Sequence, residues 1–171
     1  DMKQVAEKVA LLTGASRGIG VYIADTLAAA GCNLILVARN EAALQEHAER
    51  ITGTYGVDVD IQWADLSHPH SAEALVEAIS AGHPRVDILV NNAALITEVY
   101  FDEFDLQRLD MELAVNLRSV VALSRLLLPG MLERNEGHIV NMASLAGLGG
   151  VAHAEMYCAT KHAVVGLTRS L

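Results

Sequence analysis

The chain alternates between short apolar runs and longer amphipathic stretches. The apolar runs are rich in Val and Ile, and Gly, Asn or Asp stands near most of their ends, which is typical of β-strands. Near-continuous apolar strands indicate a parallel sheet that is covered on both faces. The pattern predicts five strands, at residues 9–12, 34–38, 57–63, 86–90 and 138–142.

The stretches between these runs have apolar positions three and four residues apart, which predicts helices. The expected helices cover residues 19–30, 41–51, 71–81, 105–128 and 155–171. Their ends are predicted from residue type, because Asn and Ser cap helix N-termini whereas Gly and Pro close C-termini. The residues that give these signals are Gly31, Asn40, Gly53, Ser71, Gly82 and the pair Pro129-Gly130.

The alternation of strand and helix implies βαβ units with right-handed crossovers. We therefore predict an α/β fold, with a doubly wound parallel sheet between two layers of helices, as one domain over residues 1–171. In such a sheet, ligands bind beyond the carboxyl ends of the strands, where the strand order reverses. The apolar rhythm of the last helix runs to Leu171 without a stop signal, so we expect the domain to be incomplete at its C-terminus.

Composition and charge narrow the class of protein. Apolar residues make up 52% of the chain, which suits a doubly covered sheet. The formal net charge of −9 argues against nucleic-acid and anionic-membrane partners, because phosphate binding needs clustered Lys and Arg. The apolar run at 120–132 is interrupted by Arg125 and Pro129, so no transmembrane helix is expected. Cys32 and Cys158 are far apart in sequence, which favours a reducing, cytoplasmic location.

A glycine-rich turn joins the first strand to the first helix. Residues 13–20 read Thr-Gly-Ala-Ser-Arg-Gly-Ile-Gly. Glycine permits positive φ and the close approach of a ligand, and the following helix N-terminus offers free N–H groups to a pyrophosphate. A turn that binds no ligand is the alternative. A Walker-type phosphate loop is disfavoured, because no Gly-Lys-Ser or Gly-Lys-Thr follows.

The end of the second strand indicates which dinucleotide is preferred. An NAD site needs an acidic residue there for the ribose hydroxyl, but residues 37–40 read Val-Ala-Arg-Asn. Arg39 suits a 2′-phosphate, which a carboxylate would repel, and Arg17 in the glycine-rich turn can approach the same group. We therefore expect NADP as the cofactor, with NAD as the second choice. A solvated surface charge is the alternative for either arginine.

Four polar residues are candidates for the chemistry. Tyr157 and Lys161 are four residues apart on the last helix, so their side chains share a face, where an ammonium favours a phenolate. Ser144 follows the fifth strand, where a hydroxyl can stabilise charge on a substrate carbonyl. Asn116 lies inside the long helix, where Asn has poor propensity. Taken singly, each is better explained by a structural role: the Tyr/Lys pair as a pair on the helix surface, Ser144 as a cap and Asn116 as a tolerated polar residue.

Taken together, the motifs resemble the short-chain dehydrogenase/reductase family, classical type, from Lys8 to Leu171. The family has a Thr-Gly-x-x-x-Gly-x-Gly turn and an Asn, Ser and Tyr-x-x-x-Lys set in the same order. Its Asn-Asn-Ala-Gly segment is similar to residues 91–94, where Ala94 replaces the glycine. The resemblance implies a Rossmann fold whose last strands are missing here. It also implies a cofactor site built from Gly14, Ser16, Arg17, Gly18, Ile19, Gly20, Arg39, Asp65, Leu66, Asn92, Ala93, Tyr157 and Lys161.

The resemblance also implies a role for each candidate. Tyr157 is the general acid/base, and Lys161 favours its phenolate and holds the nicotinamide ribose. Ser144 orients the substrate, and Asn116 supports a proton-relay water. Asp65 contacts adenine, for which a turn or cap aspartate is the alternative.

The implied function is an NAD(P)(H)-dependent oxidoreductase that moves hydride between nicotinamide and a carbonyl or alcohol carbon of a small molecule. A homo-oligomer, either a dimer or a tetramer, is expected. Because family members continue beyond the last helix into a substrate-covering segment, a non-catalytic dinucleotide-binding or oligomerisation module is the alternative. Hydrolysis is disfavoured, since Ser144 lacks a Gly-x-Ser-x-Gly elbow, and the seven histidines show no metal-ligand spacing. Apolar residues indicate a moderately apolar substrate pocket near Leu145, Leu148 and Val151.

Overall fold

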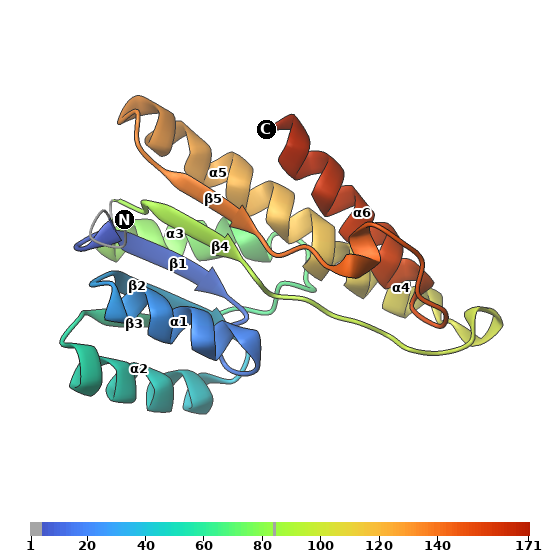
Figure 1. Cartoon of the computed structure of the whole chain (residues 1–171), viewed down its shortest axis with the longest axis horizontal. Helices are drawn as coiled ribbons and strands as arrows, with labels where there is room; N and C mark the ends of the chain where they lie inside the picture. Colours follow the sequence, from blue (N-terminus) through green and yellow to red (C-terminus); the bar gives the residue numbers. More distant parts are fainter. Residues whose placement is uncertain (1–4, 84) are drawn as a thin grey trace.

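A computed structural model describes residues 5–83 and 85–171 and contains a parallel sheet of five strands (Figure 1). Residues 1–4 and 84 of the predicted domain lie outside the described residues. The strands, in the spatial order β3-β2-β1-β4-β5, are β1 (Val9–Thr13), β2 (Asn33–Ala38), β3 (Val59–Trp63), β4 (Ile88–Asn91) and β5 (His138–Asn141). All five predicted strands are confirmed. Because the chain proceeds from β1 first to one side and later to the other, the strand order reverses at β1, where a ligand crevice is expected.

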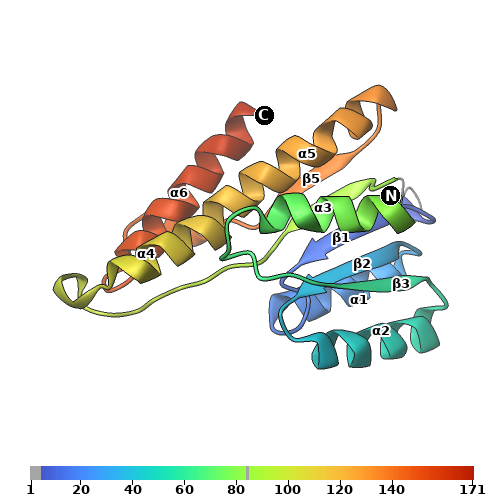
Figure 2. The same ribbon diagram turned by 180° about the vertical axis from the view of Figure 1, so that it is seen from behind.

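Helices cover both faces of the sheet, which confirms the three-layer α/β/α arrangement (Figure 2). α1 (Ile19–Ala29) and α2 (Glu41–Tyr55) pack on one face, and α3 (Ser71–Gly82) packs on the other with α5 (Ser119–Glu133). Neighbouring residues of the central strand β1 point into opposite core clusters, so the strand is apolar on both faces, as its sequence predicts. α6 (Glu155–Ser170) packs beside α4 (Leu106–Leu113).

Two predicted helix ends are wrong, because glycine alone does not stop a helix. α2 continues past Gly53 to Tyr55 and ends where Gly56 adopts a left-handed φ of 69°. α3 likewise includes Gly82 as its last residue. A glycine inside a helix costs only about 1 kcal/mol, which the surrounding hydrogen bonds and packing offset.

The predicted N-caps have different outcomes. Asn40 caps α2 as predicted, and its side chain accepts a hydrogen bond of 3.1 Å from the Ala43 N–H. Ser71 does not cap α3; instead, its hydroxyl donates to the carbonyl of His68 at 2.9 Å. The cap position is taken by His70, which has a left-handed φ of 64° and makes no side-chain cap bond. The Ser71 hydroxyl thus lies one residue too late in the chain to cap α3.

The helix predicted at 105–128 consists of three segments. After α4, a π-helical turn over Ala114–Arg118 leads into α5. The spacing of apolar residues does not reveal such a turn, because it inserts only one residue into the helical repeat. α5 passes Pro129, so the predicted stop at Pro129-Gly130 is wrong. Pro129 lies on the exposed side of α5, where the carbonyl that it leaves unpaired can bond to water.

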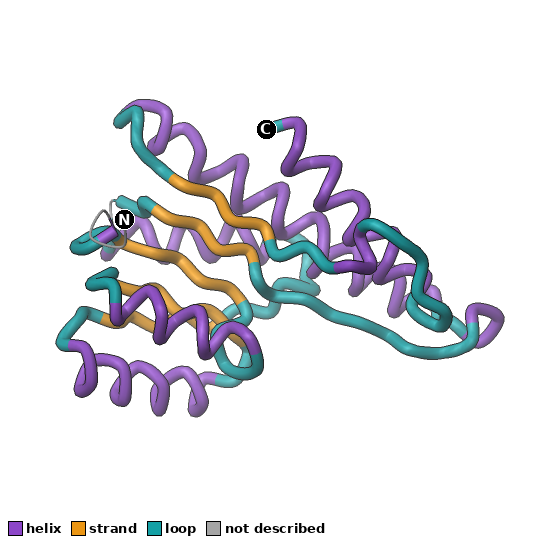
Figure 3. Tube along the Cα trace, viewed as in Figure 1, coloured by secondary structure: helices purple, strands orange, loops and turns teal. Residues whose placement is uncertain are grey.

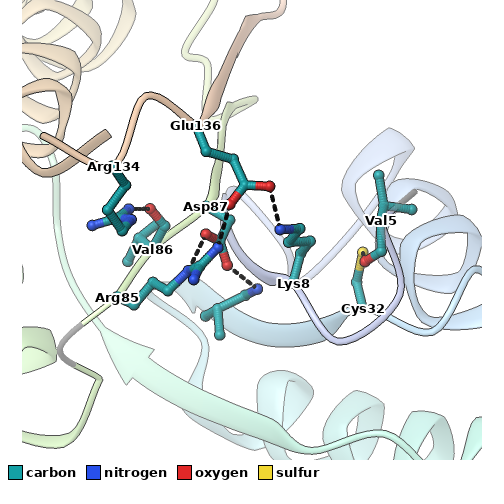
Figure 4. A network of polar contacts seen from close by, with 9 residues as sticks. Val5, Lys8, Cys32, Arg85, Val86, Asp87, Arg134 and Glu136 are labelled. Carbon is teal, nitrogen blue, oxygen red and sulfur yellow. Dashed lines mark hydrogen bonds and ion pairs between the residues drawn. The ribbon is translucent and has the colours of Figure 1, made fainter. Parts of the chain in front are cut away.

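Ion pairs join three segments of the chain at the amino end of the sheet (Figure 4). Asp87, before β4, accepts hydrogen bonds from Arg85 and, at 3.0 Å, from the Val9 N–H. Glu136, before β5, accepts hydrogen bonds from Lys8 and Arg85. Burial raises the pKa of Asp87, but the hydrogen bonds from Val9 and Arg85 and the charges of Arg85 and Lys8 together lower this pKa by more. The network fixes the starts of β1, β4 and β5, at the opposite end of the sheet from the glycine-rich turn.

A carboxylate on α4 is buried without a partner. Glu112 is 0% exposed, and neither of its carboxylate oxygens has a hydrogen-bond partner within the described part of the chain. Removal of a polar group from water without a compensating hydrogen bond opposes folding. Glu112 therefore lowers the stability of the fold.

The variant Glu112→Leu is expected to raise the free energy of unfolding by about 1–3 kcal/mol, because it removes this unpaired polar group from the interior. Urea unfolding followed by circular dichroism measures the change. Glu112→Gln is the matched control; it keeps a polar group at the position and should gain less. A Leu variant less stable than the parent chain would show that the carboxylate stabilises the fold.

Candidate functional site

The backbone of the glycine-rich turn requires its glycines. Gly14 and Gly18 have left-handed φ values of 69° and 58°. A Cβ on Gly20 would lie 2.2 Å from the carbonyl oxygen of Gly14, whereas a Cβ on Gly18 would meet no described atom within 4 Å. Gly18 is the N-cap residue of α1, and no described side chain caps this end. The N-terminus of α1 therefore keeps N–H groups that no described side chain caps, which suits the binding of an anion.

The side chains of Thr13 and Asn92 join the glycine-rich turn to the end of β4 by hydrogen bonds. The Thr13 hydroxyl accepts hydrogen bonds from the N–H groups of Asn92 and Ala93, at 3.1 and 3.0 Å. The Asn92 amide donates to the carbonyls of Thr13 and Gly14, at 3.0 and 3.2 Å. Asn92 and Ala93 are among the predicted site residues, whereas Thr13 is not. The signal that points to Thr13 is its position directly before Gly14.

A cleft of about 810 Å³ lies over the carboxyl ends of β1, β2, β3 and β4 and reaches α4. Its walls come from the glycine-rich turn and from the segments that follow β2, β3 and β4. Gly20 lies beneath the turn, packed against Gly14 and Asn92. The predicted cofactor residues that line the cleft are Gly14, Ser16, Arg17, Gly18, Ile19, Arg39, Asp65, Leu66, Asn92 and Ala93.

A cation and a carboxylate face each other in the wall of the cleft. The Arg39 side chain is 59% exposed, and its Nη1 lies 3.9 Å from a carboxylate oxygen of Asp65. Asp65 also accepts hydrogen bonds from the Ser67 hydroxyl and N–H, at 2.8 and 3.0 Å. Burial raises the pKa of Asp65, but the bonds from Ser67 and the charges of Arg39 and His68 lower it by more. Asp65 thus stabilises a local turn, the alternative role considered for it, and lines the cleft as well.

Asn116 connects the cleft wall to α6. It lies in the π-helical turn, is 1% exposed, and exchanges two hydrogen bonds of 2.7 Å with the backbone of Leu95. Its amide also donates to the Thr160 hydroxyl on α6, at 3.1 Å. Leu95 lines the cleft, whereas Thr160 directly precedes Lys161. π-helical turns are frequent at functional sites, and this one carries the residue that joins the two halves of the site.

Tyr157 and Lys161 lie close together on α6. The Lys161 Nζ is 5.5 Å from the centroid of the Tyr157 ring and donates to the carbonyl of Met142, at 2.7 Å. Lys161 is 3% exposed, and burial lowers the pKa of its ammonium. Met142 directly follows β5, and its N–H donates to the Asn91 carbonyl at the end of β4. The ammonium therefore lies at the carboxyl end of the sheet, the same end as the glycine-rich turn.

Ser144 lies between β5 and α6. Its hydroxyl oxygen accepts a hydrogen bond of 3.1 Å from the Ala146 N–H and thereby caps a 3-10 turn over Leu145–Gly147. This bond uses a lone pair of the hydroxyl and not its proton, so capping and donation to a substrate are compatible. The catalytic candidates of the C-terminal half do not line the cleft itself; Asn116 joins them to its wall.

Other features bear on the class of protein. Cys32 and Cys158 are buried free thiols, and burial, followed by the charge of Asp87, raises the pKa of Cys32. Over residues 5–83 and 85–171, no helix combines the length and apolar character needed to cross a bilayer. In the same residues, no three His, Cys, Asp or Glu side chains gather into a possible metal site.

Known sequences resemble this chain over nearly all of its length. The family model described as short chain dehydrogenase matches residues 8–171. An uncharacterised oxidoreductase of Staphylococcus saprophyticus is 35% identical over 170 residues, which cover 99% of this chain and 73% of that protein. The granaticin polyketide synthase putative ketoacyl reductase 1 of Streptomyces violaceoruber is 41% identical over 172 residues, which cover 97% of this chain and 61% of that protein.

Solved structures share the fold. A metagenomic short-chain oxidoreductase in complex with NADP superposes with a TM-score of 0.92 at 35% identity, covering 97% of this chain and 75% of that one. L-sorbose reductase from Gluconobacter frateurii, complexed with NADPH and L-sorbose, has a TM-score of 0.92 at 31% identity. The match covers 97% of this chain and 63% of that one. The chain thus spans about three fifths to three quarters of the length of these relatives. By sequence and by fold, the chain belongs to the short-chain dehydrogenase/reductase family.

Proposed function

We propose that this chain is an oxidoreductase that prefers NADP and moves hydride between the nicotinamide and a carbonyl or alcohol carbon of a small molecule. The observation that carries the proposal is the buried Lys161 ammonium, held by Met142 beside Tyr157 at the same end of the sheet as the glycine-rich turn. The two structural relatives described above are complexes with NADP or NADPH, which supports the choice of cofactor.

The cleft fits a dinucleotide in size and in chemistry. Its volume of about 810 Å³ falls within the range of roughly 300–1,000 Å³ that is typical of small-molecule sites. The uncapped N-terminus of α1 and the open space at Gly18 suit a pyrophosphate. Arg17 and Arg39 offer cations to a ribose phosphate, and Asp65 with Leu66 would border the adenine.

The residues of the C-terminal half supply the proton chemistry. When bound, the reduced cofactor supplies the hydride. Tyr157 donates a proton to the carbonyl oxygen during reduction, and the Lys161 ammonium stabilises the phenolate that is left. The Ser144 hydroxyl donates a hydrogen bond to the same oxygen as charge develops on it. Asn116 fixes the adjoining segments and supports the water through which the phenol regains its proton.

The proposal extends to partners and location. The substrate is a small molecule, and the net charge of −9 makes nucleic acid and anionic membranes poor partners. The protein is a homo-oligomer of two or four copies. It works in the cytoplasm, where the two buried thiols stay reduced.

NADPH oxidation in the presence of a panel of ketones tests the proposal, with the loss of NADPH absorbance as the readout. We expect turnover with at least one ketone, and faster turnover with NADPH than with NADH. Tight NADPH binding without turnover of any ketone would favour a non-catalytic dinucleotide-binding or oligomerisation module instead.

The variant Arg39→Ala is expected to raise the Kd for NADPH by roughly 10- to 100-fold, since a charge-assisted hydrogen bond contributes about 1.5–3 kcal/mol. The Kd for NADH should change by less than about twofold, because NADH has no 2′-phosphate. Isothermal titration calorimetry measures both values. Arg39→Lys, the control, keeps the charge but not the planar fork and should be intermediate. Equal losses for the two cofactors would refute the assignment of Arg39.

A further inference from the structure

Two loops meet beside the proposed catalytic residues and form what we call the mouth, residues 95–105 and 145–155. The first loop follows β4 and runs far out from the sheet, to the turn that precedes α6 (Figure 3). The Val99 N–H donates to the His153 carbonyl at 3.1 Å, and the rings of Tyr100 and His153 stack edge to face with centroids 4.6 Å apart. Ser144 and Tyr157 flank the second loop in sequence, so the mouth adjoins the proposed catalytic residues.

The mouth exposes large apolar side chains. Leu145, the neighbour of Ser144, is 86% exposed, and Leu148 and Val151 on the same loop are 66% and 50% exposed. Ile96, on the facing loop, is 47% exposed. Exposed apolar side chains that gather at one place mark a surface that binds an apolar ligand.

The mouth contains acidic residues but no Lys or Arg. The sequence has no Lys or Arg from 86 to 107 or from 135 to 160, and Lys161 is buried against a backbone carbonyl. The exposed carboxylates of the mouth are Glu98, Asp102, Glu103, Asp105 and Glu155. The cations of the site, Arg17 and Arg39, line the cleft over the dinucleotide-binding half. The arginine side chains of the site therefore lie on the side of the proposed cofactor phosphates, whereas the mouth carries carboxylates.

We propose that the mouth selects neutral, apolar carbonyl compounds and rejects anionic ones such as carboxylates and phosphorylated acyl thioesters. This inference rests on the proposed function, because it describes the substrate of the same site. A carboxylate that approaches Ser144 gains no Lys or Arg partner in the mouth and is repelled by the mouth's carboxylates, whose charges are screened over about one Debye length, ~8 Å at physiological ionic strength. A neutral ring or alkyl chain instead covers the exposed leucines without that repulsion.

A matched pair of ketones tests the inference: the methyl ester of 4-acetylbenzoate, which is neutral, and 4-acetylbenzoate itself, which has the same ring and ketone. For the NADPH-loaded chain, we expect kcat/KM for the ester to exceed that for the carboxylate by at least about tenfold at low salt, and the ratio to shrink as salt screens the charges. Saturation-transfer NMR of the two compounds with the NADP-loaded chain gives a binding readout that does not require turnover.

Reversing the charge of single carboxylates tests whether the preference for the ester arises in the mouth. Glu98→Lys and Asp102→Lys, both at exposed positions of the mouth, should each lower the ester-to-carboxylate ratio by about threefold or more. Glu77→Lys, on the exposed side of α3, makes the same change in net charge outside the mouth and should leave the ratio unchanged. These exposed substitutions leave the core and the proposed catalytic residues intact.

The outcomes separate the inference from the function on which it rests. Preference for the ester that depends on salt, and that falls in Glu98→Lys but not in Glu77→Lys, supports the inference. Equal or better use of the carboxylate overturns it and leaves the oxidoreductase assignment standing. NADPH binding with neither turnover nor binding of any ketone overturns the proposed function and the inference together.

Discussion

The variant Tyr157→Phe is expected to lower kcat by at least about 10³-fold while the Kd for NADPH changes by less than about twofold. The phenol is the proposed proton donor, and positioned acid/base groups contribute about 10²–10⁴-fold to rate. Phe keeps the ring that packs near the Lys161 ammonium, 5.5 Å from its centroid, but has no proton to give. Steady-state NADPH oxidation gives the loss of rate, and calorimetry gives the cofactor affinity.

A matched control for this variant is Tyr22→Phe on α1, which removes a phenol that is 73% exposed. Its turnover should equal that of the parent chain. Retained turnover in Tyr157→Phe would contradict the acid/base assignment. A loss of both turnover and NADPH binding would instead show that the phenol has a structural role in the cleft.

The variant Gly20→Ala is expected to weaken NADPH binding by at least about tenfold and to lower the free energy of unfolding by about 1–3 kcal/mol. The new Cβ would lie 2.2 Å from the Gly14 carbonyl oxygen and 2.9 Å from the Asn92 amide nitrogen. Because the Gly14 contact is with backbone, the turn itself must move, and the hydrogen bonds between Asn92 and the turn are strained. The N–H groups proposed to bind the pyrophosphate then lose their alignment.

Gly53→Ala provides the control, because a Cβ there would meet no described atom within 4 Å. In the interior of α2, alanine should raise the free energy of unfolding by roughly 0.5–1 kcal/mol and leave NADPH affinity unchanged. Titration with NADPH measures the cofactor affinity of both variants, and urea unfolding measures their free energies of unfolding. A Gly20→Ala chain that binds NADPH like the parent would show that the turn does not hold the cofactor.

The parts of the fold that depend on local sequence are predictable. The five strands follow from their apolar runs, and Asn40 caps α2 because its side chain needs only the backbone three residues ahead. Helix ends are less predictable, because Gly53 and Pro129 are both carried inside helices by hydrogen bonds and packing on either side. The π-helical turn around Asn116 is invisible in the apolar spacing, although the presence of Asn in a helix is a weak sign of it.

The candidate site is also only partly predictable from the sequence. The candidate side chains are recognisable from motifs, but the backbone and side-chain groups that hydrogen-bond to them are not. Leu95 and Met142 act through backbone atoms, which no residue type reveals, and Thr160 contacts Asn116 only because α6 packs against the π-helical turn. Glu112, whose carboxylate has no hydrogen-bond partner among residues 5–83 and 85–171, also gives no sign in the sequence, since a carboxylate on an amphipathic helix is expected to face solvent.

Transfer of deuterium tests the central claim most directly. The chain is supplied with NADPH that bears deuterium at the reactive carbon of the nicotinamide, together with a neutral aryl ketone, and the alcohol formed is analysed by mass spectrometry and NMR. The account predicts one deuterium on the carbinol carbon, which Tyr157→Phe transfers at a rate lower by at least about 10³-fold. An alcohol without deuterium on that carbon, or equal transfer by Tyr157→Phe, would contradict it.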